Sequence, residues 1–444
     1  IAVAARPFLQ STEIAVPHPG YAERDMERMW RTNCDVLRGL LVRAGVDPAD
    51  VRAVACCGHG KGLYLWGRDG KPVRAGIVSM DNRAAEYARR WEEDGTAAKA
   101  FAFSCQRVLA CQPVALLAWL RDNEPENYRN IRWVFECKDY VRCRLTGEAF
   151  AEVTDYSGTN LMNLHTRDYD PRLLGLFGLE AAGGALPPLR LSTDVCGRIT
   201  EEAAALTGLK AGTPVVGGMF DIDACALATG VLSDDIFSIT AGTWNINVFP
   251  SKTMAPLDGG CMNSVFPTGN TLVEASSPTS AGNLDYVLRM MTADGSKAAS
   301  YDELGAMLER TDAKYTDVLF LPFLYGSNVN LGAEGAFIGL RSSSERDQLL
   351  RAVYEGVVFA HRHHVEQLLR VLGHKPKAIR ISGGVCNSDP WVQMFADVLN
   401  LPVETVAVTE LGGLGGAMCA AVGSGLYGSF QEAFDNMSKL AKRF

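Results

Sequence analysis

Short apolar runs that end in glycine constrain the fold of this chain most strongly. Three of them, TPVVGGM, IFSITAG and AIRISGG, occupy residues 213–219, 236–242 and 378–384. Their length, and the glycines at which they end, predict buried β-strands bounded by turns. Amphipathic stretches separate such runs along the chain. Because strands alternate with helices, the sequence predicts the α/β fold class.

Two of the amphipathic stretches predict helices with defined ends. Residues 20–45 place methionine, tryptophan and leucine side chains at helical spacing, and Gly45 ends the stretch. The longest stretch covers residues 345–371, for which we expect Ser344 as the N-cap and Gly373 as the closing residue. A chain of 444 residues with such elements suits two substantial domains.

Charge and cysteine usage narrow the class of protein. The net charge is −8, which argues against nucleic acid or an anionic membrane as the main partner. The sequence has no apolar stretch of roughly eighteen residues that predicts a membrane span, and no secretion signal is visible at its start. Twelve cysteines are scattered without a C-x-x-C spacing. Reduced thiols in a cytoplasmic protein are therefore expected.

A carboxylate follows the first of the three apolar runs. Asp221 comes three residues after Gly218, and the small apolar residues ACALATG begin soon after it. This pattern predicts a strand-to-helix junction where another group can approach the backbone closely. Such a place suits a general base or a metal-binding carboxylate. A helix N-cap is the alternative that the pattern alone favours, and Asp223 competes for that role.

The other two runs are followed by segments that suit a phosphate or a planar ring. Gly242 and Thr243 could present backbone N–H groups and a hydroxyl to a phosphate, although an ordinary hairpin turn is the interpretation favoured by the pattern alone. Gly383 and Gly384 precede a helix that Asp389 can cap, which leaves an open surface of backbone. Neither segment carries a G-x-G-x-x-G or P-loop motif.

One long stretch resembles a known family signature. GAFIGLRSSSERDQLLRAVYE, Gly335–Glu355, agrees at every defined position with the C-terminal signature of the FGGY family of carbohydrate kinases. GHGKGL, SMDNRAAE, RLTGEAFAEVTDYSGTNLMN, LTGLKAGTPVVGGMFD and LGGLGGAMCA also follow that family, in order, so the resemblance covers nearly the whole chain. PGYAERDM, GKGLYL, QPVALLAWLRDNEPENY, SPTSAGNLDY and LPFLYGSN resemble its L-xylulose kinase branch.

The resemblance implies a fold and an activity. The fold is the two-domain actin-like ATPase (ribonuclease H-like) fold, with a sugar-binding N-terminal domain at residues 1–231, a nucleotide-binding C-terminal domain at 232–444, and a cleft between them. The activity is phosphorylation of a ketopentose, L-xylulose above all, at its terminal hydroxyl, with ATP and Mg²⁺ as cofactors. Two alternatives stay open. The substrate could be another pentulose, a polyol or a keto-gulonate, or the protein could be a non-catalytic sugar sensor. A homodimer is expected by family.

The resemblance also implies site residues. Asp221 falls on the family's catalytic base. The positions that match sugar contacts are His59, Gly60, Lys61, Asp81, Cys111 and Gln112. The positions that match nucleotide contacts are Gly242, Thr243, Gly282, Gly383, Gly384 and Asn387. For Asp81, a structural ion pair within the Asp-Asn-Arg triplet stays open, and no complete protein metal site is visible.

The chain also departs from the family pattern. The family opens with a strand and an Asp-x-Gly-Thr-like phosphate loop ahead of the segment where Ile1 stands, and it closes with a helix after Phe444. We therefore expect a trimmed chain. Leu116 stands where the N-terminal signature has lysine, and Ile222 where many relatives have a polar residue.

Two further patterns have competing interpretations. His361 and His364 are spaced i, i+3 on the long predicted helix. A metal-binding pair is one interpretation, but we favour a packed or solvated helix face. The glycine-rich residues 411–425 contain the spacing of membrane helix dimers, yet the stretch is too short to span a bilayer, so we expect a close-packed helix.

Overall fold

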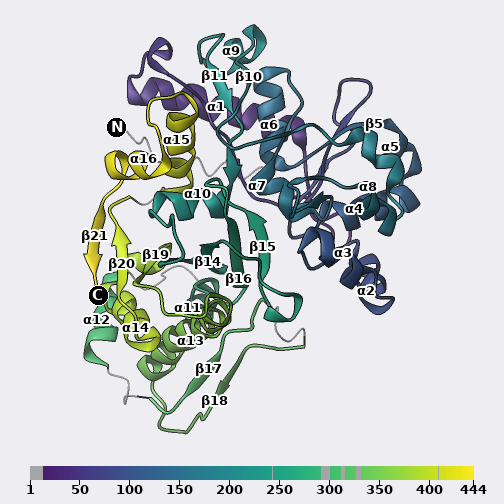
Figure 1. Cartoon of the computed structure of the whole chain (residues 1–444). Helices are drawn as coiled ribbons and strands as arrows, with labels where there is room; N and C mark the ends of the chain where they lie inside the picture. The colour runs from purple at the N-terminus through teal and green to yellow at the C-terminus, as the bar shows by residue number, and fades with distance from the viewer. Residues whose placement is uncertain (1–13, 243, 292–300, 312–315, 327–331, 409) are drawn as a thin grey trace. The chain divides into compact units, whose positions relative to one another are not determined.

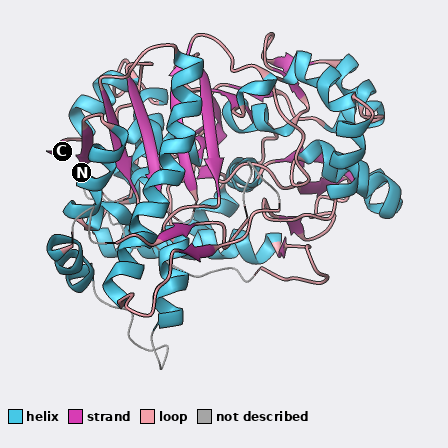
Figure 2. Cartoon of the chain, turned by 90° about the horizontal axis from the view of Figure 1, so that it is seen from below, coloured by secondary structure: helices cyan, strands magenta, loops and turns pink. Residues whose placement is uncertain are grey.

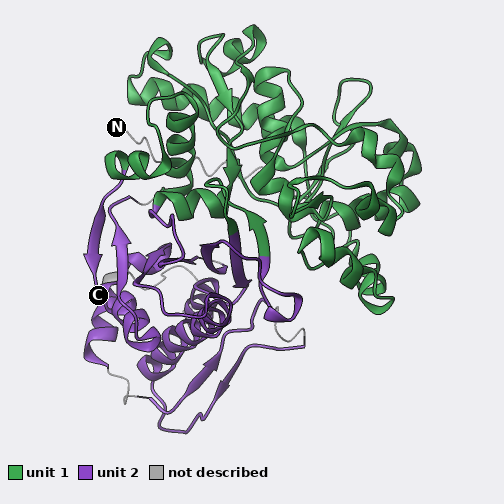
Figure 3. Ribbon diagram, viewed as in Figure 1, with its two compact units in different colours: residues 1–228, 263–271, 410–437 green, residues 229–262, 272–409, 438–444 purple. Residues whose placement is uncertain are grey.

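A computed structural model describes most of the chain. The described residues are 14–242, 244–291, 301–311, 316–326, 332–408 and 410–444. They belong to two compact units, which Figure 3 shows in green and purple. Unit 1 comprises residues 1–228, 263–271 and 410–437, and unit 2 comprises 229–262, 272–409 and 438–444. Among the described residues, no helix is both long enough and apolar enough to cross a membrane.

Unit 1 combines short strands with many helices (Figure 1). Its strands are β1 (Glu23–Arg24), β2 (Cys57–Gly58), β3 (Tyr64–Gly67), β4 (Gly76–Ile77), β5 (Ile131–Phe135), β6 (Ala151–Glu152), β7 (Met162–Asn163), β8 (Asp168–Tyr169), β9 (Leu189–Arg190), β10 (Val195–Arg198), β11 (Pro214–Val216), β12 (Met219–Phe220) and most of β15 (Met262–Val265). Its helices are α1 (Met26–Ala44), α2 (Ala85–Glu93), α3 (Thr96–Ser104), α4 (Pro113–Asn123), α5 (Pro125–Asn130), α6 (Cys137–Thr146), α7 (Val153–Tyr156), α8 (Pro171–Leu176), α9 (Glu201–Thr207), α10 (Asp221–Ala228), α15 (Leu411–Gly423) and α16 (Phe430–Met437).

Helix α1 ends where its sequence predicts, but it begins later than residue 20, at Met26. The Asp25 side chain accepts a hydrogen bond from the backbone N–H of Arg28 at 2.8 Å, which caps the N-terminus. Gly45 closes the helix in the left-handed conformation, with φ at 59°. Met26 and Trp30 belong to its buried stripe, which packs into one of the unit 1 cores. The prediction of a helix that ends at Gly45 is confirmed.

The glycine-rich helix α15 packs closely against α10. A Cβ atom added to Gly415 would lie 2.1 Å from the carbonyl oxygen of Ala224 and 2.6 Å from its Cα. Glycine is therefore the residue type that lets the two helix backbones come this close. The expected close-packed helix at residues 411–425 is confirmed, and it supports the helix that begins at Asp221.

Unit 2 is built on a sheet whose strands in this unit have the order β16-β14-β13-β19-β20-β21. Figure 2 shows its long strands side by side, with helices beside them. Strands β13, β19 and β20 are parallel, whereas β14 is antiparallel to β13 and β21 is antiparallel to β20. The strands of this unit are β13 (Ile236–Ala241), β14 (Asn245–Ser251), β16 (Thr271–Ser277), β17 (Leu319–Leu321), β18 (Ala336–Ile338), β19 (Ala378–Ser382), β20 (Val403–Val406) and β21 (Leu440–Arg443), and its helices are α11 (Gly282–Met291), α12 (Tyr301–Arg310), α13 (Arg346–Leu372) and α14 (Asp389–Leu399).

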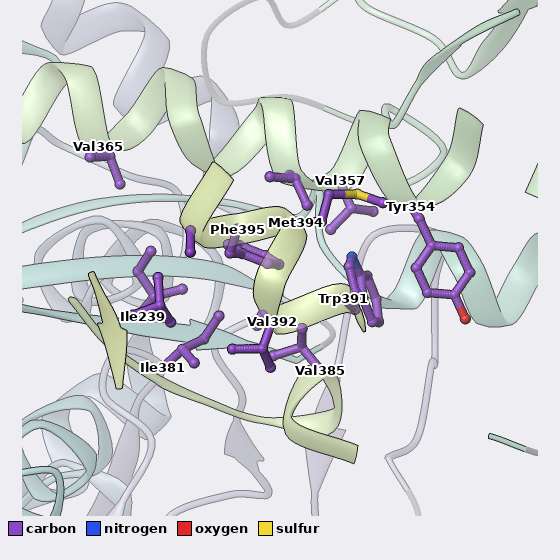
Figure 4. Close-up of a cluster of buried hydrophobic side chains, with 14 of the residues drawn as sticks. Ile239, Tyr354, Val357, Val365, Ile381, Val385, Trp391, Val392, Met394 and Phe395 are labelled. Carbon is purple, nitrogen blue, oxygen red and sulfur yellow. The ribbon is translucent and has the colours of Figure 1, made fainter. Parts of the chain in front are cut away.

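Helices α13 and α14 form the core of unit 2 with this sheet. Figure 4 shows Tyr354 and Val357 of α13 beside Trp391 and Phe395 of α14, with Ile381 of β19 nearby. The rings of Tyr354 and Trp391 meet edge to face at 4.5 Å between centroids, a geometry that the ring quadrupoles favour. The core thus joins the longest helix to the parallel strands.

The N-terminus of α13 differs from the prediction. Glu345, not Ser344, is the N-cap, and Gln348 completes a capping box because its side chain accepts from the backbone N–H of Glu345 at 2.9 Å. The hydroxyl of Ser344 instead accepts a hydrogen bond from the backbone N–H of Arg341 at 3.0 Å. The predicted closure at Gly373 is confirmed.

Two of the three histidines of α13 lie in a buried hydrogen-bond network. His361 bonds to Ser280 and to Asn247, each at 3.0 Å. His364 bonds to Ser277 at 2.7 Å and to Gln367 at 2.8 Å. A packed helix face is therefore confirmed. Burial lowers the pKa of both imidazoles, that of His364 to about 4.

Helix packing at Gly415 yields a stability prediction. Gly415→Ala forces α15 away from α10, and overpacking of this kind costs roughly 1–3 kcal/mol, or about 3–10 °C in Tm. Gly412→Ala is the matched control on the same helix, because a Cβ there meets no atom within 4 Å. Calorimetry should show a lower Tm for the first variant only. Equal Tm values for both variants would contradict the close contact.

The buried histidines yield a pH prediction. The pKa of His364 is about 4 in the folded protein, below the ordinary 6.5. Acidification therefore protonates the unfolded chain first, and stability falls as pH drops from about 7 to 4. His364→Gln should reduce the loss between pH 7 and pH 5 by roughly 1–2 kcal/mol, as measured by calorimetry. An unchanged loss of stability in His364→Gln would contradict this effect of burial.

Candidate functional site

Two strands of unit 1 end side by side and bring the first group of predicted site residues together. β2 and β12 pair in parallel, with Gly58 opposite Phe220. His59 follows the end of β2, and Asp221 follows the end of β12. The carboxyl ends of neighbouring parallel strands are where α/β proteins place their ligands. The loop that begins at His59 and the carboxylate of Asp221 therefore start from the same edge.

Asp221 occupies a strand-to-helix junction, as predicted. It is the first residue of α10, directly after β12, and it is half-buried. It also borders a groove of about 650 Å³ within unit 1. The groove is lined by apolar side chains of α1, by residues of β2 and by glycines of α15, and Asp221 is the one charged residue in this lining among the described residues. Its role as a base stays a prediction.

The loop after β2 is held in a strained, well-defined shape. His59 Nε2 bonds to the hydroxyl of Tyr64 at 3.0 Å. Lys61 has a φ of 66°, in the left-handed region that side chains other than glycine seldom adopt. The N–H of Gly62 donates to the carbonyl oxygen of Cys111 at 2.7 Å. The structure thus holds the end of the loop that follows His59 against Cys111, and the sugar contacts of His59, Gly60 and Lys61 stay predictions.

Gln112 is buried, and both the nitrogen and the oxygen of its side-chain amide form hydrogen bonds. Its side chain donates to the carbonyl oxygen of Gly158 at 2.9 Å and accepts from Leu109 and Asn160 at 2.8 Å each. Burial raises the pKa of the neighbouring Cys111 thiol, which favours the neutral form. Gln112 shapes the segment around Cys111, and direct sugar contacts from both residues stay predictions.

Asp81 forms an ion pair with Arg83, the structural role that the sequence offered as an alternative to a sugar contact. One carboxylate oxygen accepts from the backbone N–H of Ala22 at 2.6 Å, and the guanidinium of Arg83 lies within 2.9 Å of both oxygens through separate nitrogens. Arg83 also lies over the ring of Tyr21, 4.1 Å from its centroid. The carboxylate of Asp81 is therefore bound by groups of the protein itself, and its role as a sugar contact stays a prediction.

The second group of predicted residues meets at one edge of the unit 2 sheet. β13 and β19 are parallel, with Thr240 opposite Ser382. Gly242 follows the first strand, and Gly383 follows the second. A Cβ on Gly383 would lie 2.4 Å from the carbonyl oxygen of Ala241, and its φ of 97° also favours glycine. The two glycine segments therefore lie against each other.

The other residues that we predict to contact the nucleotide lie in different elements of unit 2. Gly384 and Asn387 are the ends of a short 3₁₀ helix, and Asn387 is exposed. Gly282 is buried as the first residue of α11, which follows β16, a strand separated from β13 by β14. Thr243 lies outside the described residues. Gly383 is exposed, and Gly242 is half-buried, with its N–H donating to the carbonyl oxygen of Trp244 at 3.3 Å. Exposed backbone at Gly383 suits phosphate oxygens, which accept hydrogen bonds from N–H groups.

A buried charge cluster supports the unit 1 site and was not predicted. Lys138 Nζ lies 2.9 Å from Asp139, 3.2 Å from Glu152 and 3.5 Å from Asp155, and all four side chains are fully buried. Glu152 and Asp155 lie in a stretch that carries the family resemblance, RLTGEAFAEVTDYSGTNLMN, but their contact with Lys138 depends on tertiary packing. Among the described residues, no group of three or more His, Cys, Asp or Glu side chains could hold a metal ion.

Comparison with known proteins yields consistent matches over most of the chain. Residues 6–228 match the N-terminal domain of the FGGY family of carbohydrate kinases, and residues 237–424 match its C-terminal domain. The L-xylulose/3-keto-L-gulonate kinase of Escherichia coli (strain K12) is 39% identical over 421 residues, 94% of this chain and 83% of the relative. A probable L-xylulose kinase of Pasteurella multocida is 34% identical over 93% of this chain and 85% of the relative.

Solved structures agree with these matches. The xylulose kinase from Rhodospirillum rubrum superposes with a TM-score of 0.87 at 27% identity, over 98% of this chain and 88% of that chain. The ligand-bound xylulose kinase from Lactobacillus acidophilus gives a TM-score of 0.89 at 20% identity, over 98% and 87%. At 20% identity the second likeness speaks for the fold alone.

Proposed function

Because this chain belongs to the FGGY family of carbohydrate kinases, we propose that it transfers the γ-phosphate of ATP to the terminal hydroxyl of a ketopentose, L-xylulose above all. Family membership makes the protein a sugar kinase with ATP as the phosphoryl donor. The expected two-domain α/β fold of the actin-like ATPase type is also confirmed by the structural likenesses.

The position of Asp221 supports this function most directly. Its carboxylate starts from the edge where the loop after β2 also starts, so a hydroxyl bound by that loop can reach it. In phosphoryl transfer the protein mainly positions the reactants and neutralises charge, since the transition state is loose. Asp221 accepts the proton of the attacking hydroxyl and orients that oxygen toward phosphorus.

The other predicted residues divide between the two reactants. The sugar contacts, His59 to Lys61 and Cys111 among them, lie in the N-terminal part, for which we propose domain bounds of 1–231. The nucleotide contacts at Gly242, Gly383 and Gly384 lie in the C-terminal part, 232–444. Mg²⁺, when bound through the phosphates of ATP, neutralises their charge. The close backbone approach at Gly383 supports a phosphate or ring site there.

The choice of sugar follows from the relatives. The name of the Escherichia coli relative includes both L-xylulose and 3-keto-L-gulonate, and the Pasteurella multocida relative is named for L-xylulose. L-xylulose is therefore the first candidate and 3-keto-L-gulonate the second. A cytoplasmic location and a homodimer stay predictions.

The substrate prediction is tested by ADP release. With ATP and Mg²⁺ present, a coupled assay over L-xylulose, D-xylulose, L-ribulose and 3-keto-L-gulonate should give the highest kcat/KM with L-xylulose. A higher value with 3-keto-L-gulonate would move the assignment to the second candidate. Binding of a sugar by calorimetry without any ADP release would support a sensor and contradict the kinase.

The role of Asp221 is tested by Asp221→Asn. Loss of the base should lower kcat at least about 100-fold, or roughly 3 kcal/mol, while the Kd for ATP stays unchanged. Asp35→Asn is the control, since Asp35 lies exposed on α1 and the same chemical change there should leave kcat at the wild-type value. Near-normal kcat in Asp221→Asn would remove the assignment.

A further inference from the structure

The end of strand β12, directly before Asp221, is tied to the buried charge cluster by a single hydroxyl. We propose that this residue, Thr154, is a positioning residue of the kinase: it holds the backbone that carries the candidate base. The inference rests on the proposed function, because it concerns the placement of Asp221 for that reaction. Four steps in the structure support it.

The first step is the hydrogen bond to the strand itself. The N–H of Phe220, the residue before Asp221, donates to Thr154 Oγ1 at 3.0 Å. Successive N–H groups of a strand point to opposite sides. That of Met219 therefore bonds to the carbonyl oxygen of Cys56 beside β2, at 3.2 Å, while that of Phe220 turns away from β2. On that side the Thr154 hydroxyl takes the place of a neighbouring strand.

The second step fixes the hydroxyl. Thr154 Oγ1 donates its proton to Glu152 Oε2 at 2.7 Å, so a lone pair is left to face the N–H of Phe220. The other oxygen of Glu152 accepts from the backbone N–H of Thr154 at 3.0 Å and from Ser192 Oγ at 2.7 Å. Lys138 Nζ lies 3.2 Å from Glu152 Oε2. The hydroxyl therefore bonds to a carboxylate that is itself held at both oxygens.

The third step links the same cluster to the loop after β2. A Cβ on Gly58 would lie 3.2 Å from Lys138 Cβ, so the lysine stem packs beneath the end of β2. Asp155, next to Thr154 in the chain, lies 3.5 Å from Lys138 Nζ, and its Oδ1 lies 2.7 Å from where a Cβ of Gly60 would be. The cluster thus contacts both the base-bearing strand and the predicted sugar loop.

The fourth step concerns the rest of the β12 connection. Arg142 Nη1 donates to the carbonyl oxygen of Gly217 at 2.6 Å and pairs with Asp139 at 2.8 Å. Asp139 also pairs with Lys138. The chain from Gly217 to Phe220 is therefore anchored to one buried ionic network at both of its ends. Such anchoring restricts the backbone that carries Asp221, and catalysis that depends on orientation requires restraint of this kind.

A purely structural role of Thr154 would lead to different experimental results. If Thr154 only stabilises unit 1, its loss lowers Tm as any comparable buried hydroxyl does, and kcat of the folded protein is unaffected. Thr207 offers that comparison, because its buried Oγ1 also donates one hydrogen bond, to Ala203 O at 2.7 Å, and accepts one, from Leu209 N at 3.2 Å. Thr207 belongs to α9, outside the proposed site.

The experiment compares Thr154→Val, Thr154→Ser and Thr207→Val. In the ADP-release assay, Thr154→Val should lower kcat about 10- to 100-fold with the KM for ATP unchanged, since a misplaced base loses alignment. Thr154→Ser keeps the hydroxyl and should return kcat to within about threefold of wild type. Thr207→Val should lower Tm by a similar amount to Thr154→Val and leave kcat intact.

A second measurement does not depend on activity. Hydrogen–deuterium exchange of the peptide that contains Phe220 should quicken in Thr154→Val and stay as in wild type in Thr154→Ser and Thr207→Val. An unchanged peptide, wild-type kcat in Thr154→Val, or an equal loss of kcat in Thr207→Val each overturns the positioning role while the kinase assignment stands. A wild-type protein that phosphorylates no sugar overturns the kinase assignment and this role together.

Discussion

The parallel pairing of β2 with β12 is the contact on which the unit 1 site depends. It is short, with Cys57 opposite Met219 and Gly58 opposite Phe220. Because the strands run in the same direction, the loop that follows one and the carboxylate that follows the other start from one edge. A shift of register by one residue would turn every side chain to the other face and separate Asp221 from His59. The close packing of Gly415 against α10 holds the helix that continues from this pair.

In each unit, a buried polar network supports segments of the candidate site. In unit 1 the network is ionic, centred on Lys138, and it reaches β12 through Thr154. In unit 2 it is uncharged, and His361 and His364 join α13 to Asn247 of β14 and to the segment before Gly282. Buried polar groups are costly unless they are satisfied, and a satisfied network specifies one arrangement of the chain. Such networks suit loops that must bind ligands in one geometry, more than a purely apolar core would.

Glycine is needed at two positions where backbone segments pack closely together. At Gly383 both a positive φ and the nearness of Ala241 exclude a side chain, and the two predicted nucleotide segments touch for that reason. At Gly415 only the nearness of α10 matters. The sequence showed these glycines as runs, GG in each case, but a run does not say which member makes the contact. Gly383 meets Ala241 in the first run, whereas in the second Gly415 meets α10 and its neighbour Gly416 meets Cys57.

Local patterns in the sequence determined the helix that ends at Gly45, the strand at residues 378–382, the junction at Asp221, the α/β class and the family. Periodicity, turn residues and signature motifs are properties of neighbouring residues, so they can be recognised without a structure. The roles of the predicted site residues stay predictions. Tertiary structure alone decided that Glu345 and not Ser344 caps α13, that Asp81 pairs with Arg83 and Ala22, and that Thr154 bonds to Phe220, 66 residues away. The bonds to Ala22 and Phe220 depend on how distant segments pack. The cap of α13 and the Asp81–Arg83 pair are local, but a hydrogen-bonding group takes whichever of its nearby partners the folded backbone brings within reach.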